Sequence, residues 1–300
     1  MAEYGLAYWN AQSRNSTVTD EAMVAMRSHP RFRPAVRVAM AEAARLYDAD
    51  PTMRRTLSDT GRGAMGFLAL YLDATGGLTL GRINDLMHEI DAGSRGRAAA
   101  FLIWLRMIGY IEPSNDQPDK RSRLYSPTPH MHAAISALLR KDIAALSQVV
   151  PAAAAVLPIF DQPDVFDRFL AELGRGIVDV IKSSAPERAF MRIFASRNSG
   201  NIIVQALLSS SDDDDTFPPS RPVPASVAAL AKRFDTSRSH VLRMLRDAED
   251  SGLLVRDAEA GTITILPAFG EEVLEFFTVY FVGLAACCYH ALSGEAATAA

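Results

Sequence analysis

The stretch 235–254, "DTSRSHVLRMLRDAEDSGLL", has the pattern of a helix with one buried face and one basic face. Its apolar residues Val241, Leu245 and Ala248 recur at helical spacing and predict a buried stripe. Gly252 predicts the end of the helix, because glycine tolerates the positive φ of a helix C-cap. The face opposite the stripe holds Arg238, Ser239, Leu242, Arg243 and Arg246.

The segments on either side of this helix predict a compact supersecondary unit. Upstream, "VPASVAALAKRF" (223–234) has the spacing of a second amphipathic helix, and the two residues Asp235 and Thr236 make a short turn between the helices. Downstream, 253–256 and 262–266 predict a small hairpin that turns at Gly261.

The same order of elements occurs earlier in the chain. "LTLGRINDLMHEI" (78–90) parallels 223–234, "SRGRAAAFLIWLRMIGYIE" (94–112) parallels 237–255, and "EPSNDQPDKRSRLYSP" (112–127) parallels the second hairpin. Ser94 aligns with Ser237 and Gly109 with Gly252 at one constant offset. The preceding helices also correspond, "GRGAMGFLALYLD" with "SRNSGNIIVQALL".

A helix, a tight turn, a second helix, Gly-Leu-Leu and a hairpin together resemble the winged helix-turn-helix module of bacterial transcription regulators, with a MarR-like layout. The resemblance implies a mainly α fold with two such modules, each with a small β-hairpin wing, plus connecting and flanking helices. We expect five regions: an N-terminal helical segment, the first module, connecting helices, the second module, and a C-terminal packing or dimerisation helix, at 1–60, 61–128, 129–196, 197–267 and 268–300.

The resemblance also implies a set of DNA-binding residues, because the second helix of such a module is the recognition helix. Small hydroxyls and arginines at a helix N-terminus, where the amides add partial positive charge, suit phosphates and base edges. In the second module these residues are Ser237, Arg238, Ser239, His240, Arg243 and Arg246. In the first module they are Ser94, Arg95 and Arg97 at the helix start and Lys120, Arg121 and Arg123 in the wing.

The two predicted recognition helices differ in chemistry. Where the second has Arg243 and Arg246, the first has Ala100 and Ile103, with Trp104 beside them. An exposed apolar face suits packing better than DNA reading. We therefore expect the first module to hold phosphates or a minor groove with its helix start and wing, and the second to read bases; both wings should contact the DNA backbone.

Composition allows two domains and no global attraction to DNA. The chain has 300 residues and a formal net charge of −4, so anion binding must come from local patches. One such patch lies between Arg221 and Arg246, with six Lys or Arg and one Asp. The two cysteines are adjacent and predict no disulfide, and no signal peptide is recognised, which together favour the cytoplasm.

Elsewhere the chain reads as helix and loop. We expect helices at 34–48, 64–74, 130–148, 163–182, 187–197 and 268–293, strands only in the two hairpins, and an exposed acidic and proline-rich loop at 209–224. The 14 uncharged residues at 276–289 are too few to span a bilayer and predict a buried core helix, so no membrane partner is expected.

The remaining motifs indicate structure rather than chemistry. "GRGAMG" (61–66) matches a dinucleotide-binding pattern, but no strand is predicted before it. The pairs His130 and His132, and Cys287 and Cys288, lack the further ligands of a metal site. The run 212–215 of four aspartates lacks the glycine and glutamate of a calcium loop. We expect no metal, no cofactor and no enzymatic activity.

The sequence thus favours a cytoplasmic, sequence-specific DNA-binding transcription regulator. Its expected partners are double-stranded DNA and a small-molecule effector, for which helices at 156–181 and 273–289 offer a pocket, although core packing explains those helices equally well. Pairing through a homo-oligomer and pairing inside an internal pseudo-dimer both remain open. Two alternatives stand: a plasmid replication initiator with tandem winged helices, a class that is usually strongly basic, and a winged-helix adaptor that binds protein.

Overall fold

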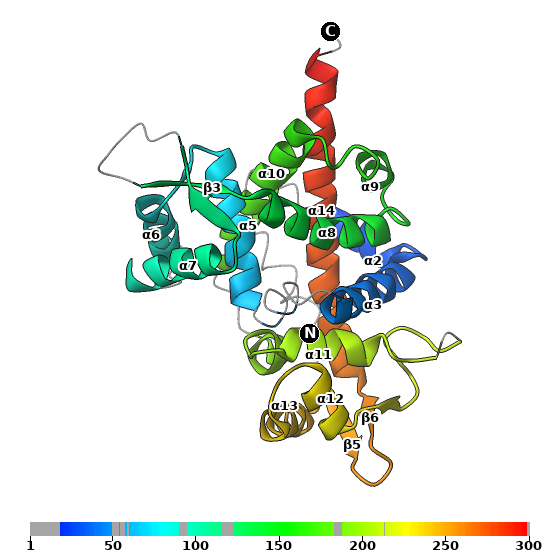
Figure 1. The fold of residues 1–300 in the computed structure, drawn as a ribbon. Helices are drawn as coiled ribbons and strands as arrows, with labels where there is room; N and C mark the ends of the chain where they lie inside the picture. Colours follow the sequence, from blue (N-terminus) through cyan, green and yellow to red (C-terminus); the bar gives the residue numbers. More distant parts are fainter. Residues whose placement is uncertain are drawn as a thin grey trace.

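The fold is mainly helical and carries two small antiparallel sheets, as the sequence predicts. The computed structural model describes residues 19–49, 54, 58, 60–89, 95–115, 123–182, 188–212 and 214–298. The long helix α14 (Pro267–Thr298) runs through the molecule, with one sheet to its left and the other at the bottom of the view (Figure 1).

Each sheet belongs to a unit with the same order of elements. The first unit consists of α5 (Thr60–Ala74), β1 (Leu78–Thr79), α6 (Leu80–Glu89), α7 (Arg95–Met107), β2 (Ile111–Pro113) and β3 (Leu124–Pro127). The second unit consists of α11 (Gly200–Leu208), β4 (Val223–Pro224), α12 (Val227–Arg233), α13 (Arg238–Asp250), β5 (Leu254–Asp257) and β6 (Thr262–Ile265). The strand orders, β1-β3-β2 and β4-β6-β5, are equivalent.

The expectation that strands occur only in the two hairpins is wrong, because each sheet has a third strand. β1 pairs with β3 through Leu78 and Tyr125, and β4 pairs with β6 through Val223 and Ile263. A strand of two residues shows no alternation in the sequence, so its pairing with a distant hairpin leaves no local signal.

The two units end their last helix in the same way. Gly109 after α7 and Gly252 after α13 both adopt the left-handed conformation, with φ of 73° and 69°. The residue after each glycine donates its N–H to a carbonyl in the last helical turn, at 2.8 Å in the first unit and 2.9 Å in the second. This is the Schellman type of helix C-cap, and it turns the chain from the helix into the hairpin.

Replacing either glycine with alanine is expected to lower the free energy of unfolding by about 1–2 kcal/mol. A Cβ at Gly109 or Gly252 meets no atom within 4 Å, so the loss is purely conformational. Urea denaturation measures it. Gly176→Ala is the matched control: it also has open space around the new Cβ, but lies inside a helix without positive φ, so it should stabilise by about 0.5–1 kcal/mol. Equal effects at the three positions would contradict the assignment.

The other helices form the body between the two units. They are α2 (Asp20–Ser28), α3 (Phe32–Ala49), α8 (Pro129–Leu146), α9 (Pro151–Val156) and α10 (Pro163–Lys182). The correspondence between the units extends into this body, since a long helix that starts with proline follows each hairpin: α8 after β3 and α14 after β6. Proline suits a first helical position, where its missing N–H has no intrahelical partner.

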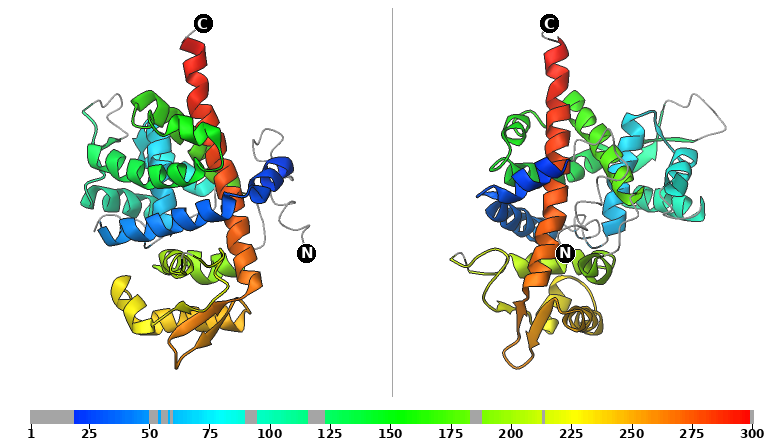
Figure 2. Two further views of the ribbon diagram at one scale, coloured as in Figure 1. Left: turned by 90° about the vertical axis from the view of Figure 1, so that its right-hand side faces the viewer. Right: turned by 180° about the vertical axis from the view of Figure 1, so that it is seen from behind.

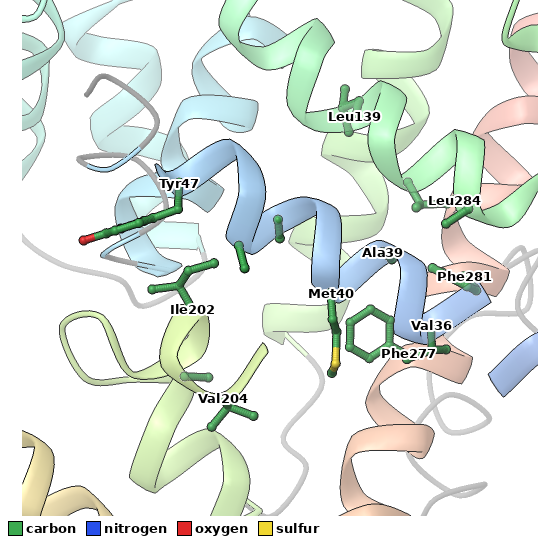
Figure 3. Packing of buried hydrophobic residues seen from close by; sticks show 14 of the residues in the cluster. Val36, Ala39, Met40, Tyr47, Leu139, Ile202, Val204, Phe277, Phe281 and Leu284 are labelled. Atoms are coloured by element: carbon green, nitrogen blue, oxygen red, sulfur yellow. The ribbon is translucent and has the colours of Figure 1, made fainter. Parts of the chain in front are cut away.

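The body helices cross between the two units. α3 precedes the first unit, yet it packs against α11 of the second unit as well as against α8. Correspondingly, α10 precedes the second unit and packs against α5 of the first unit as well as against α14. Figure 3 shows α3 in this position, with Tyr47 near Ile202 of α11 and Val36 near Phe281 of α14. The two halves of the chain are therefore interlocked around one continuous core.

Two segments depart from the sequence prediction. The helix expected at 187–197 is mostly a π-helix, η1 (Met191–Ala195), in which Phe194 stacks on Phe269 with ring centroids 5.5 Å apart. The loop 209–224 is not simply exposed, because Phe217 is buried and the strand β4 occupies its end. Local sequence shows neither feature, since both are formed by packing against distant elements.

Three of the four aspartates in this loop have hydrogen-bond or ion-pair partners. The Ser220 hydroxyl and nearby backbone N–H groups donate to Asp215 and lower its pKa to about 2. Arg221 lies 2.6 Å from Asp214 and 3.5 Å from Asp212. These contacts reduce the repulsion among the three described aspartates of the run.

α14 is longer than its uncharged segment suggests. Pro267–Ser293 is the one helix, among the described residues, with the length and apolar composition to cross a membrane, and half of its most apolar window is buried inside the protein. The prediction that this segment is too short to cross a membrane is therefore wrong. The prediction that the helix packs in the core is supported by its burial. Both views in Figure 2 show the last turns of α14 projecting beyond the body.

A polar network lies inside the core between α8 and α14. The Lys141 Nζ is 2.6 Å from the Asp142 Oδ1, and both side chains are less than one-tenth exposed. The Tyr280 hydroxyl donates to the Asp142 Oδ2 at 2.7 Å. Burial and the neighbouring carboxylate raise the pKa of Tyr280 well above its ordinary value, so the phenol keeps its proton and continues to donate.

Candidate nucleic-acid interface

The helix α13 is held by local contacts at its start. The Ser237 hydroxyl accepts the N–H of His240 at 3.1 Å and caps the helix. A turn joins α12 to α13, in which Asp235 has a φ of 47° and Thr236 donates its N–H to Ala231 at 3.0 Å. Phe234 in the turn is fully buried and anchors both helices.

The burial of α13 agrees with the predicted stripe. Val241, Leu245 and Ala248 are buried, together with Met244. The opposite face is exposed and carries Arg238, Ser239, Arg243 and Arg246. Within the described residues, no hydrogen bond or ion pair engages the guanidinium groups of these three arginines, so they face solvent with all their donors available.

Two of the acids on α13 are neutralised by other elements. Arg197 lies 2.7 Å from Asp247, and Arg256 of β5 lies 2.6 Å from Glu249. The backbone N–H and the guanidinium of Arg256 lower the pKa of Glu249. Asp250, in the last turn, is exposed. The outer face of α13 is therefore positive over its first two turns.

A shallow hollow of about 660 Å³ lies between α12 and α13. Three alanines line it, Ala228, Ala229 and Ala231, together with Lys232, Arg238 and the exposed Asp235. A phosphate that approaches this surface therefore meets two cations and one carboxylate.

Two of the predicted contact residues have internal roles. His240 is half-buried, and its Nε2 lies 3.0 Å from the carbonyl oxygen of Asn198, which requires the hydrogen on Nε2. It therefore positions α13 against the turn before α11. The Ser237 hydroxyl is engaged as the helix cap and lies 3.0 Å from the Ser239 hydroxyl.

The basic patch between Arg221 and Arg246 is smaller than the residue count suggests. Arg221 is paired with the aspartates of its own loop, and Arg233 lies 2.8 Å from Asp48 of α3. The predicted patch of six basic residues therefore has only four without an ion pair among the described residues, because Arg221 and Arg233 are paired with aspartates. The four are Lys232, Arg238, Arg243 and Arg246.

In the first unit Ala100 and Ile103, on the outer face of α7, are exposed and apolar, as expected. Ile103 is 58% exposed and Met107 is 80% exposed. Phe101 and Trp104 stack with centroids 5.8 Å apart and cover part of the core. Guanidinium groups capable of reading bases are therefore absent from the middle of this described helix.

The basic residues of the first unit lie around this apolar segment. Arg97 in the first turn of α7 is exposed, and so is Arg123 before β3. Ser94, Lys120 and Arg121 lie outside the described residues. Arg95 is the first residue of α7, and its side chain also lies outside them.

The hairpin of the second unit is acidic at its tip. Asp257 and Glu259 are exposed there, and the nearest arginine, Arg256, is paired with Glu249. The expectation that both hairpins contact the DNA backbone is therefore not supported for the second, because exposed carboxylates repel phosphates.

The expected effector pocket between 156–181 and 273–289 is not what the structure shows. The aromatic side chains of these segments pack in the core, as Phe160 and Phe169 do with centroids 5.0 Å apart. A polar hollow of about 380 Å³ lies instead between α5, α6 and α10, lined in part by Tyr71, Asp85 and Asp179.

Neither histidines nor cysteines form a reactive cluster in the described part of the chain. No group of three or more His, Cys, Asp or Glu side chains there is placed to hold a metal ion. Cys287 and Cys288 are buried, and burial raises the pKa of Cys288 to about 12, which keeps its thiol protonated and unreactive.

Comparison with known proteins does not assign the chain to a family. No family model, no curated protein and no solved structure matches the chain. The candidate interface consequently rests on the placement and charge of its own residues.

Proposed function

We propose that this protein is a sequence-specific DNA-binding transcription regulator and that its two units are winged-helix modules. The observation that carries the proposal is the outer face of α13, where Arg238, Arg243 and Arg246 are exposed and have no partner among the described residues. Carboxylates that would compensate them, Asp247 and Glu249, are engaged by other arginines.

The placement of α13 suits a major groove. The second helix of a helix-turn-helix enters the groove with its N-terminal residues against the base edges. Arg238 lies at that end, Arg243 and Arg246 lie one and two turns further along, and Lys232 flanks them across the hollow. Arginine pairs with both acceptors of guanine, and either cation can contact a phosphate.

The crossing body helices support an internal pseudo-dimer. The helix that precedes each unit packs on the other unit: α3 packs on the second unit and α10 packs on the first. The two units thus exchange helices in an approximately symmetric way within one chain. One polypeptide thereby presents two modules, an arrangement that other DNA-binding proteins obtain from two subunits.

Selection of purified protein against random and genomic DNA fragments at moderate salt tests the proposal. An enriched motif is expected, because unpaired arginines on a groove-sized helix discriminate between base pairs. Weak binding that is sensitive to salt and selects no motif, or no binding, would overturn it, since phosphate contacts alone carry no sequence information.

A second candidate function is supported by α7. Ile103 and Met107 are both exposed and lie four residues apart on one face of α7, which favours a protein-binding surface. An adaptor function requires this surface and not α13. It predicts partner binding through α7 and no DNA motif for the whole chain.

Replacing Ile103 and Met107 together with glutamine tests whether α7 contributes to DNA binding. Both side chains are largely exposed, so the free energy of unfolding should change by less than about 0.5 kcal/mol. If α13 is the reader, affinity for the selected DNA should stay within about twofold, as measured by fluorescence anisotropy. A loss of tenfold or more would show that α7 contacts bases, for example thymine methyl groups.

A further inference from the structure

The two units present opposite chemistry at equivalent positions, and this bears on the kind of DNA that the chain recognises. The inference rests on the proposed function. Aligned through their glycine caps, Arg243 of α13 corresponds to Ala100 of α7, and Arg246 corresponds to Ile103. Both members of each pair are exposed.

These substitutions leave the first unit without the counterparts of two of the three outward arginines of α13. Guanidinium groups donate hydrogen bonds to guanine, whereas a methyl or a sec-butyl group neither donates nor accepts. Among the described side chains, the remaining exposed arginines of α7 are Arg97 and Arg106, near its two ends; Arg95, which aligns with Arg238, lies outside them. Beyond its first turn, α7 is apolar at both positions where α13 has an exposed arginine.

The hairpins differ in charge in the opposite way: the second hairpin is acidic and the first is basic in sequence. The tip of the second hairpin carries exposed Asp257 and Glu259. The sequence of the first hairpin carries Lys120, Arg121 and Arg123, of which Arg123 is described and exposed. Among the described residues, the first hairpin thus carries an exposed cation and the second hairpin exposed acids, whereas the second unit has its exposed cations on α12 and α13.

The crossing of α3 and α10 makes a second chain unnecessary for pairing. The helix α3 already packs on the second unit, and α10 already packs on the first. The surface that two subunits would share is therefore buried inside one chain. Phe234 of the second unit, for example, packs on Tyr47 of α3 with centroids 5.1 Å apart.

We propose that a single chain binds a non-palindromic DNA site, in which the second unit reads one half by sequence and the first unit holds the adjacent duplex through its phosphates alone. A symmetric dimer requires a palindrome because its two readers are identical. Here the two readers differ within one chain, so the site needs sequence information on one side only.

A base-pair scan of the selected duplex tests this inference, with affinity measured by anisotropy and stoichiometry by sedimentation. Substitutions in one half should each lower affinity about 5- to 150-fold, and substitutions in the other half should change it less than twofold. One chain should bind one duplex. A palindromic motif, sequence dependence in both halves, or two chains per duplex would overturn it.

Arg123→Ala supplies the second measurement. It should lower affinity by the same factor for every sequence and reduce the slope of log affinity against log salt by about 1, because it removes one phosphate contact. An altered motif in this variant would contradict the division between the units. If the wild-type protein selects no motif at all, the proposed function itself is overturned. That outcome differs from a motif that is palindromic or read in both halves, which overturns only the present inference.

Discussion

Replacing Arg238 and Arg243 together with alanine is expected to reduce binding of the selected DNA motif to the level of random DNA. Each arginine that pairs with both acceptors of a guanine contributes about 1–3 kcal/mol of discrimination. The two side chains are exposed and lack intramolecular partners in the described chain, so their removal leaves the fold unchanged. Anisotropy titrations of motif and scrambled duplexes measure the loss.

Arg31→Ala is the matched control for this experiment. Arg31 is also exposed and lies in the turn between α2 and α3, and its replacement removes one positive charge where the double variant removes two. It should leave motif affinity within about twofold, because a single distant charge is screened at moderate salt. Equal affinities of wild type and the Arg238/Arg243 variant would contradict base reading by α13. An equal, modest loss on both duplexes would reassign these arginines to phosphate contacts.

Replacing Asp142 with alanine is expected to lower the free energy of unfolding by about 3–5 kcal/mol. Asp142 is 3% exposed, and its removal leaves the Lys141 ammonium and the Tyr280 hydroxyl buried without their acceptor. This is a large part of the about 5–15 kcal/mol that stabilises an ordinary domain. Urea denaturation followed by circular dichroism measures the change.

The combined variant Lys141→Met, Asp142→Leu and Tyr280→Phe distinguishes an unpaired charge from a mere loss of packing. It should recover most of the lost stability, since apolar residues of similar volume leave no buried charge or donor unpaired. Asp161→Ala is the surface control. Its pair with Arg140, at 3.0 Å, is solvated, so the loss should be about 1 kcal/mol or less. A combined variant no more stable than Asp142→Ala would contradict the explanation.

The elements of the candidate site were largely predictable because their signals are local. The buried stripe of α13 follows from a helical repeat of apolar residues, and the ends of α7 and α13 follow from glycines that adopt positive φ. Helix periodicity and caps depend on residues within a few positions of one another.

Features formed by distant residues were not predictable. The strand β4 exists because Val223 pairs with Ile263, and His240 turns inward because its Nε2–H donates a hydrogen bond to the carbonyl oxygen of Asn198, just before α11. The basic patch is smaller than predicted because of another distant contact: Arg233 pairs with Asp48, which precedes it by 185 positions. A residue count registers charges but not their partners.

The sequence by itself determined that the chain contains two similar units, that α13 has a basic outer face, and that α7 has an apolar one. These properties follow from the order and spacing of neighbouring residues, which alone set helix faces and turns. Only the tertiary structure decided that α3 and α10 cross between the units and which arginines keep their charge available. Burial and ion pairing between distant segments decide such matters, because a chain brings those segments together only when it folds.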